Sequence, residues 1–236
     1  MKIQVLGLVA FASASAFAAG DPGFVHHPAP SKPVFIDAAL YDTFKSKIPA
    51  PPASQSPAQL SDEAELFRLQ ETRTTADCEI AKSEVRVSLQ SFYGSGVGIL
   101  TDDQVKLLTP FFNQLRNDGD YFVQKMKVDF PRQRPFNYIP GIQPCVAKEV
   151  SKAYPSGHAM LSRLYGLVLA DLFPSKKAVL EFRAREIGKH RVLAGMHHPT
   201  DIQSGRALAE MVYAEMKQNG SYQLTFNQMA EKCVEK

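Results

Sequence analysis

The sequence predicts an all-α protein: a single compact helical domain with its candidate functional site at helix ends, preceded by an extended N-terminal arm. The 236 residues, 44% of them hydrophobic, can bury one sizeable core. Apolar residues recur at helical spacing in several segments after residue 61. The alternation of a half-buried strand occurs only weakly, at Glu84–Leu89.

The first residues have the pattern of a secretory signal peptide. A lysine and an apolar run are followed by small residues up to Ala16-Phe17-Ala18. We therefore expect a signal peptide at 1–18, export to the periplasm with cleavage, and no membrane span in the mature form. An N-terminal membrane anchor is the alternative, but the apolar run is short and loses hydrophobicity in its Ser/Ala half.

Residues 19–60 form a predicted proline-rich arm. Half of the 16 prolines lie between Gly20 and Pro57, so a long regular element cannot persist there. One short helix is expected around Phe35 to Phe44. The arm would lie over the domain or over a neighbouring subunit, and a homodimer is one expected assembly.

The predicted helical domain spans 61–236, and its first helices follow from capping signals. Ser61 precedes acids and helically spaced leucines, and Thr101 with Gln104 forms a capping box before an apolar stripe. The Asn117-Asp118-Gly119 segment is expected to end that helix, with a new one running from Asp120 into Lys127.

Later boundaries depend on proline and serine. Prolines between Pro131 and Pro144 predict an irregular loop that can expose binding groups. Ser156 is expected to cap a helix that ends at Phe173, Ser175 to start the next, and Pro199 to be the first residue of another. A short last helix is expected at Phe226–Val234.

Charge and cysteine content exclude some classes of function. A net charge of +3 without a long run of lysines and arginines argues against nucleic acid binding. Of Cys78, Cys145 and Cys233, one pair could bridge in an oxidising compartment, but no spacing selects the pair or indicates a metal site.

Three stretches carry groups that suit phosphate: KVDFPRQRP from Lys127, YPSGH up to His158, and the segment Lys189–Arg206. Lysines and arginines are common on protein surfaces, and Ser-Gly after proline is a common helix cap, so no one stretch alone indicates a phosphate site. Together they offer three cations, Lys127, Arg134 and Arg191, for the oxygens of one tetrahedral anion. The helix start at Ser156 and Gly157 would add backbone NH donors.

Histidines supply the chemistry that hydrolysis would need. His197 and His158 can act as nucleophile and as acid for the leaving group near neutral pH. Asp201, at the third position of the helix that Pro199 opens, could orient His197, although it could equally be an ordinary first-turn acid. His190 and His198 are weaker catalytic candidates. His190 could simply pack against its helix neighbours, and His198 could cap a helix. A zinc site built from His190, His197 and His198 lacks a motif spacing.

The order of these residues resembles the signature of the phosphatidic acid phosphatase type 2 superfamily, and within it the bacterial class A non-specific acid phosphatases. The matching elements are lysine, six residues, Arg-Pro; then Pro-Ser-Gly-His; then arginine, five residues, histidine, three residues, aspartate. The resemblance implies that His197 becomes a phosphohistidine, that Asp201 orients it and that His158 protonates the leaving group. Phosphoryl oxygens would be held by Lys127, Arg134, Ser156, Gly157 and Arg191. One position departs from the family, which usually has serine where this chain has His190.

The expected function is therefore hydrolysis of small phosphate monoesters without a metal or other cofactor. The alternatives are a vanadate-dependent haloperoxidase, which shares the pocket residues of this superfamily, and a non-catalytic exported phosphate-binding protein. A lipid phosphatase is a further option, disfavoured by the lack of predicted membrane spans. No residue pattern indicates which ester is preferred.

Overall fold

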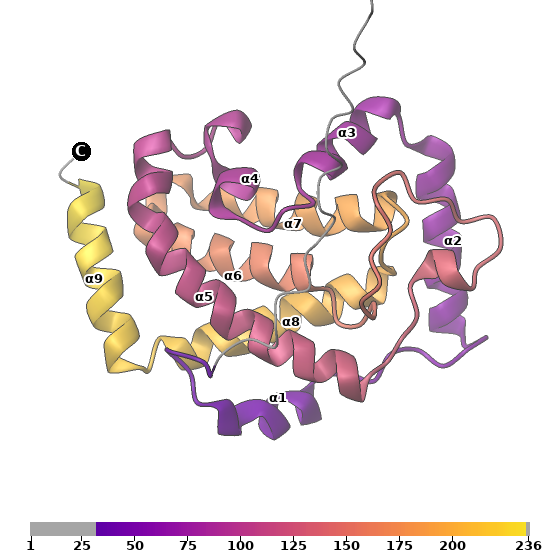
Figure 1. Ribbon diagram of the computed structural model, residues 1–236, viewed down its shortest axis with the longest axis horizontal. Helices are drawn as coiled ribbons and strands as arrows, with labels where there is room; N and C mark the ends of the chain where they lie inside the picture. Colours follow the sequence, from indigo (N-terminus) through magenta and orange to yellow (C-terminus); the bar gives the residue numbers. More distant parts are fainter. Residues whose placement is uncertain (1–31, 235–236) are drawn as a thin grey trace, which may run out of the picture.

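The computed structural model describes residues 32–234, and helices are the only regular elements in that range (Figure 1). The all-α prediction is confirmed. The helices are α1 (Tyr41–Lys47), α2 (Pro57–Thr72), α3 (Thr75–Ser83), α4 (Leu89–Tyr93), α5 (Asp102–Asp129), α6 (Gly157–Leu172), α7 (Lys177–Leu193), α8 (Pro199–Met216) and α9 (Gly220–Val234). Short 3-10 turns lie at Ala38–Leu40, Ser95–Val97, Pro135–Asn137 and Pro174–Lys176.

Helix α6 is the centre of the fold. It packs against α5, α7 and α8 (Figure 1). Most of its side chains are buried. Gly205 allows α8 to approach the start of α6 closely, because a Cβ there would lie only 2.5 Å from the Ser156 carbonyl oxygen. The start of α6 is therefore held directly against the first turns of α8.

The predicted break at Asn117–Gly119 is wrong, because α5 runs unbroken from Asp102 to Asp129. Asp118 is buried and accepts hydrogen bonds from the backbone NH groups of Val34 and Phe35, both at 2.7 Å. Gly119 lacks a side chain because α6 is close: a Cβ there would lie 2.8 Å from the Met160 sulfur. Tertiary contacts, not helix termination, account for both residues.

Several other boundaries can be compared with expectation. Ser156 caps α6 and Pro199 opens α8, as predicted. Three expected helix starts were wrong: α2 starts at Pro57 with Ser56 as its cap instead of Ser61, Ser175 lies in the 3-10 turn before α7, and α9 starts six residues before Phe226. The weak alternation at Glu84–Leu89 corresponds to no strand. Capping signals near one another in sequence compete, and packing decides among them.

The described part of the N-terminal arm packs into the main core. Phe35, Tyr41, Phe44 and Ile48 are buried there, and the helix expected around Phe35 to Phe44 begins later, at Tyr41. The division into a signal peptide at 1–18, an arm and a domain that starts at residue 61 stays a prediction, and the signal peptide lies outside the described residues. No described helix is both long enough and apolar enough to cross a membrane.

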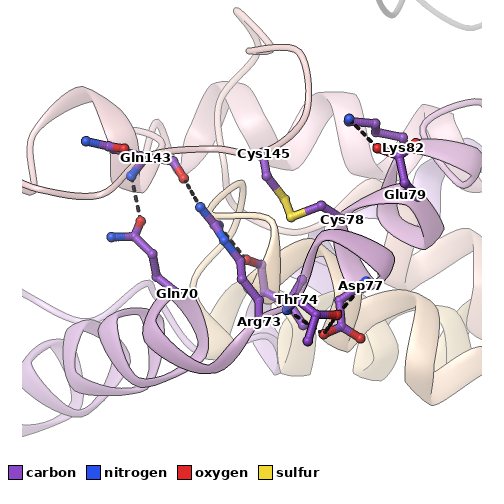
Figure 2. Close-up of a disulfide and its surroundings, with 10 residues drawn as sticks. Gln70, Arg73, Thr74, Asp77, Cys78, Glu79, Lys82, Gln143 and Cys145 are labelled. Carbon is purple, nitrogen blue, oxygen red and sulfur yellow. Dashed lines mark hydrogen bonds and ion pairs between the residues drawn. A yellow bond between two sulfur atoms is a disulfide. The ribbon is translucent and has the colours of Figure 1, made fainter.

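The loop between the 3-10 turn at Pro135–Asn137 and α6 is fastened to the end of α2 and to α3 (Figure 2). Cys78 of α3 forms a disulfide with Cys145, and Arg73 donates to the carbonyl oxygens of Gln143 at 2.6 Å and Leu193 at 2.8 Å. The disulfide selects the pair that the sequence left open, and Cys233 lies outside it, on α9. These contacts place the residues after Cys145 beside the ends of α6 and α7.

Replacing Cys78 and Cys145 together by serine is expected to lower the free energy of unfolding by about 2–4 kcal/mol. The bridge joins residues 67 apart and so restricts the unfolded chain. Urea denaturation followed by circular dichroism measures the loss, with Cys233→Ser as the matched control. An unchanged midpoint for the double variant would contradict the prediction.

Candidate active site

One small pocket gathers residues from all three stretches. It lies among α5, the start of α6 and the loops before α6 and α8. Its cavity volume is about 20 Å³. Of the eight predicted site residues, five line it: Lys127, Arg134, Gly157, His158 and His197. The remaining lining residues are Val87, Arg116, Asp120, Gln124, Glu149, Ser151 and Leu161.

Ser156, Arg191 and Asp201 lie directly behind this lining, and all three are fully buried. Ser156 is the N-cap of α6: its Oγ accepts from the Ala159 NH at 3.3 Å, while its own NH donates to the Asp201 carbonyl oxygen at 3.0 Å. The Ser156 NH is therefore engaged. NH groups for an anion must come from the first turn of α6, where Gly157 reaches the pocket.

Arg134 is buried and makes a hydrogen bond with each of its nitrogens. Its Nε donates to the Ser151 carbonyl oxygen at 2.9 Å, and its Nη1 donates to the Met196 carbonyl oxygen at 3.1 Å. Nη2 donates to the Ser151 hydroxyl at 2.9 Å and to a carboxylate oxygen of Glu149. The guanidinium plane is thus fixed by loops on both sides of the pocket.

Glu149, which the sequence reasoning missed, joins the two arginines. One of its carboxylate oxygens pairs with Arg134 and the other lies 2.8 Å from Arg191 Nη2. Burial alone would raise the pKa of Glu149, but attraction from Arg134 and Arg191 outweighs it and holds that pKa well below its usual range. The two guanidinium groups are therefore close enough to share one anion. Within the described residues, Arg191 Nε and Nη1 are buried and have no hydrogen-bond partner.

The protonation of His197 follows from its two neighbours. Arg134 Nη1 lies 2.8 Å from His197 Nε2, and because an arginine nitrogen can only donate, Nε2 must accept. His197 Nδ1 then carries the proton and faces Asp201 Oδ2 at 3.3 Å. Burial, with Arg134 next, holds the pKa of His197 well below its ordinary value, although Asp201 opposes the shift. The ring is neutral, with the lone pair of Nε2 on the Arg134 side.

His158 reaches the same pocket from the first turn of α6. Its Nε2 lies 3.0 Å from the Val85 carbonyl oxygen, so Nε2 holds a proton and Nδ1 is the nitrogen that can exchange one. Burial, followed by repulsion from Arg191, lowers the pKa of His158 to about 3. A negatively charged ligand between these groups would raise that value.

Lys127 closes the pocket from the last turn of α5, and its ammonium donates to the Lys152 carbonyl oxygen. Burial, followed by repulsion from Arg134, lowers the pKa of Lys127 to about 7. The side chain is thus charged in acid and loses its charge near neutrality. Arg134, Arg191 and Lys127 together form a cationic wall, in which Arg134 contacts His197 directly and Arg191 lies behind the pocket lining.

His190 and His198, which were predicted to lie outside the catalytic set, have defined contacts. His190 Nδ1 lies 3.0 Å from both carboxylate oxygens of Glu84 and does not line the pocket. His198 occupies the N-cap position of α8, as predicted, and its Nδ1 lies 3.0 Å from Asp201 Oδ2. Among the described residues, no three His, Cys, Asp or Glu side chains gather as a set of metal ligands.

Arg132 was also missed by the sequence reasoning. It is buried and pairs with the far side of Asp201, at 2.6 Å from Oδ1. Its only signal was its place two residues before Arg134 in the first stretch. No signal marked Glu149, which lies in a loop without a motif.

Comparison with known proteins identifies the domain in which these residues lie. Residues 118–223, which contain all eight predicted site residues, match the model of the PAP2 superfamily. The chain carries a PAP2 superfamily domain. It is 28% identical over 227 residues to a non-specific acid phosphatase of Providencia stuartii, with 91% of this chain and 90% of that protein covered. A non-specific acid phosphatase of Salmonella typhi is 26% identical over 200 residues, covering 80% of this chain and 79% of the relative.

Among solved structures, a bacterial vanadium-dependent iodoperoxidase has a similar fold, with a TM-score of 0.56 and 15% sequence identity. The alignment covers 85% of this chain and 61% of the peroxidase. At this identity the likeness concerns the fold alone. The PAP2 domain here thus has a helical framework that is also found in a peroxidase, while its sequence relatives are phosphatases.

Glu149→Gln is expected to bind inorganic phosphate several-fold more tightly than the wild type. The amide keeps the shape of the side chain but removes the negative charge that competes for Arg134 and Arg191. Isothermal titration with phosphate at pH 5 measures the change. Glu65→Gln, which alters a carboxylate paired with Arg68 on the surface, is the matched control. Unchanged or weaker phosphate binding would show that Glu149 supports the arginines without competing.

Proposed function

We propose that this protein is an acid phosphatase that hydrolyses small phosphate monoesters through a phosphohistidine on His197, without a metal. The main support is the pair Arg134 and Arg191, which share one carboxylate beside a histidine whose Nε2 must accept a hydrogen bond. The phosphatase names of the relatives support the same reaction class.

In the first step, a phosphoryl group displaces the Glu149 carboxylate from the arginines. Arg134 turns its Nη1 to a phosphoryl oxygen and so releases the lone pair of His197 Nε2. That lone pair attacks phosphorus as the ester P–O bond breaks, and His158 gives its proton to the leaving alcohol. Asp201 stabilises the positive charge that develops on His197.

In the second step, water attacks the phosphorus and His158 takes one of its protons. The P–N bond breaks, its electron pair returns to His197, and phosphate leaves. Lys127, Arg134, Arg191 and the first-turn NH groups of α6 stabilise the charge on the equatorial oxygens in both steps. Because these cations are part of the chain, the reaction as proposed needs no metal.

The low pKa of His158 supports a mechanism in which the proton that it later donates is supplied when the substrate binds. In acid a monoester is partly a monoanion, and its negative charge between the cations favours an imidazolium next to it. His158 is thus protonated when substrate binds and is neutral in the free enzyme.

We also propose that the protein is exported to the periplasm. The N-terminal pattern at 1–18 supports export, and the Cys78–Cys145 disulfide is of the kind that forms in oxidising compartments. The homodimer expected from the arm stays a prediction.

His197→Ala is expected to lower kcat for a chromogenic phosphate ester by at least about 10³-fold, because the proposed covalent intermediate forms on His197 while His158 serves as the acid. Phosphorus NMR of wild-type enzyme, denatured after brief exposure to substrate, should show phosphate bound to a histidine nitrogen. The control is Cys233→Ser, which should retain full turnover. A wild type that turns over no ester in a chelator, yet oxidises halide with vanadate and peroxide, would replace the phosphatase assignment.

The pH profile should report Lys127. As pH rises through about 7, Lys127 loses its charge and kcat/KM should fall. Lys127→Arg keeps a charge across that range, so the alkaline limb of the normalised profile should move to higher pH even if kcat is lower. Identical alkaline limbs in the two proteins would exclude Lys127 as the titrating group.

A further inference from the structure

Arg132 lies at the end of Asp201 that is remote from the pocket, and it is only 9% exposed. Its Nη1 lies 2.6 Å from Asp201 Oδ1 and 2.7 Å from the Thr200 hydroxyl. Its Nη2 lies 2.8 Å from Asp62 Oδ2 and 2.5 Å from the side-chain oxygen of Gln59. One guanidinium therefore joins two carboxylates that are 139 residues apart in sequence, one on α2 and one on α8.

The α2 side of this cluster is fastened to α8 independently of Arg132. Asp62 Oδ1 accepts from the backbone NH of Thr200 at 3.1 Å, so α2 contributes a carboxylate to the first turn of α8. Gln59 Nε2 donates to the Tyr138 hydroxyl at 2.8 Å, and that hydroxyl lies 2.8 Å from His198 Nε2. His198 in turn faces Asp201 through Nδ1.

The hydrogen bonds of Asp201 Oδ2 do not involve Arg132. It accepts from the His198 NH at 2.8 Å and faces Nδ1 of both His198 and His197. Oδ1 faces Arg132. The arginine thus restrains the one carboxylate oxygen that the histidines do not, and it adds a positive charge that offsets Asp201.

We propose that Arg132 is a positioning residue for the phosphatase reaction, which aligns Asp201 with His197 and, by offsetting its charge, keeps His197 neutral in acid. The inference rests on the proposed function. Arg132 itself touches no reacting atom. Its effect passes through Asp201 to the imidazole, and α2 takes part by holding the second carboxylate, Asp62.

Several charged groups around His197 act on its protonation. Arg134 and Lys127 disfavour its imidazolium, whereas Asp201 favours it. Glu149 lies beyond Arg134, and His158 lines the same pocket. If Arg132 lost its charge, Asp201 would attract a proton to His197 more strongly, and the pKa of His197 would rise. A nucleophile must be neutral, so the enzyme would lose activity from the acid side.

The test compares Arg132→Gln, which keeps hydrogen-bond donors but no charge, with Arg132→Lys, which keeps the charge but has a single nitrogen. The acid limb of kcat/KM should move up by about one pH unit in Arg132→Gln and stay in place in Arg132→Lys. In Arg132→Lys, kcat should fall about tenfold at all pH values, because one ammonium cannot hold both Asp62 and Asp201. Arg163→Met, which removes an arginine paired with Glu210 near the surface, is the matched control and should leave the profile unchanged.

Loss of the charge also removes the ion-pair partner of Asp62, so folding is checked by circular dichroism. The double variant Asp62→Asn with Arg132→Gln removes that spare carboxylate and should show the same shift of the acid limb. An acid limb that stays in place in both charge-free variants, or that moves equally in Arg132→Lys, would overturn the proposal. A wild type without ester turnover would instead remove the proposed function, so the two failures are distinct.

Discussion

The arrangement of the site depends on one buried carboxylate. Asp201 is fully buried and accepts hydrogen bonds from the His198 backbone, from two imidazoles and from Arg132. Burial would raise its pKa, but the hydrogen bonds from His197 and His198 outweigh burial and hold the pKa well below its usual value. A buried charge with so many partners tolerates little displacement, since each lost partner leaves an uncompensated group. Asp201 thereby fixes the loop before α8 and the face of His197 that meets the pocket.

The cationic wall consists of side chains that are kept out of water. Lys127, Arg134 and Arg191 are all buried, and mutual repulsion adds to the cost of burial. Glu149 compensates part of this charge by pairing with both arginines. Two nitrogens of Arg191 have no hydrogen-bond partner among the described residues, and a doubly charged tetrahedral anion could use them.

Features that depend on neighbouring residues could be predicted from the sequence, whereas most contacts between distant residues could not. The Ser156 cap and the Pro199 start were readable because their causes lie within a few residues. The Asp118-Gly119 pair looked like a terminator because its true partners, at Val34, Phe35 and Met160, are distant in sequence. Convergence of the three stretches could be expected from their residue order and their family resemblance. The contacts of Glu149 and Arg132 could not, because nothing local shows which way a charged side chain points.

The tether at Cys145 has a further effect on the carboxylate that holds the arginines. Glu149 follows the disulfide by four residues, a length of chain that spans at most about 14 Å. Once displaced, Glu149 cannot travel far, and it remains at high local concentration beside the arginines. As phosphate begins to leave, the returning carboxylate would occupy the vacated guanidinium groups and oppose rebinding. The enzyme would thus carry its own means of product release, limiting inhibition where inorganic phosphate accumulates.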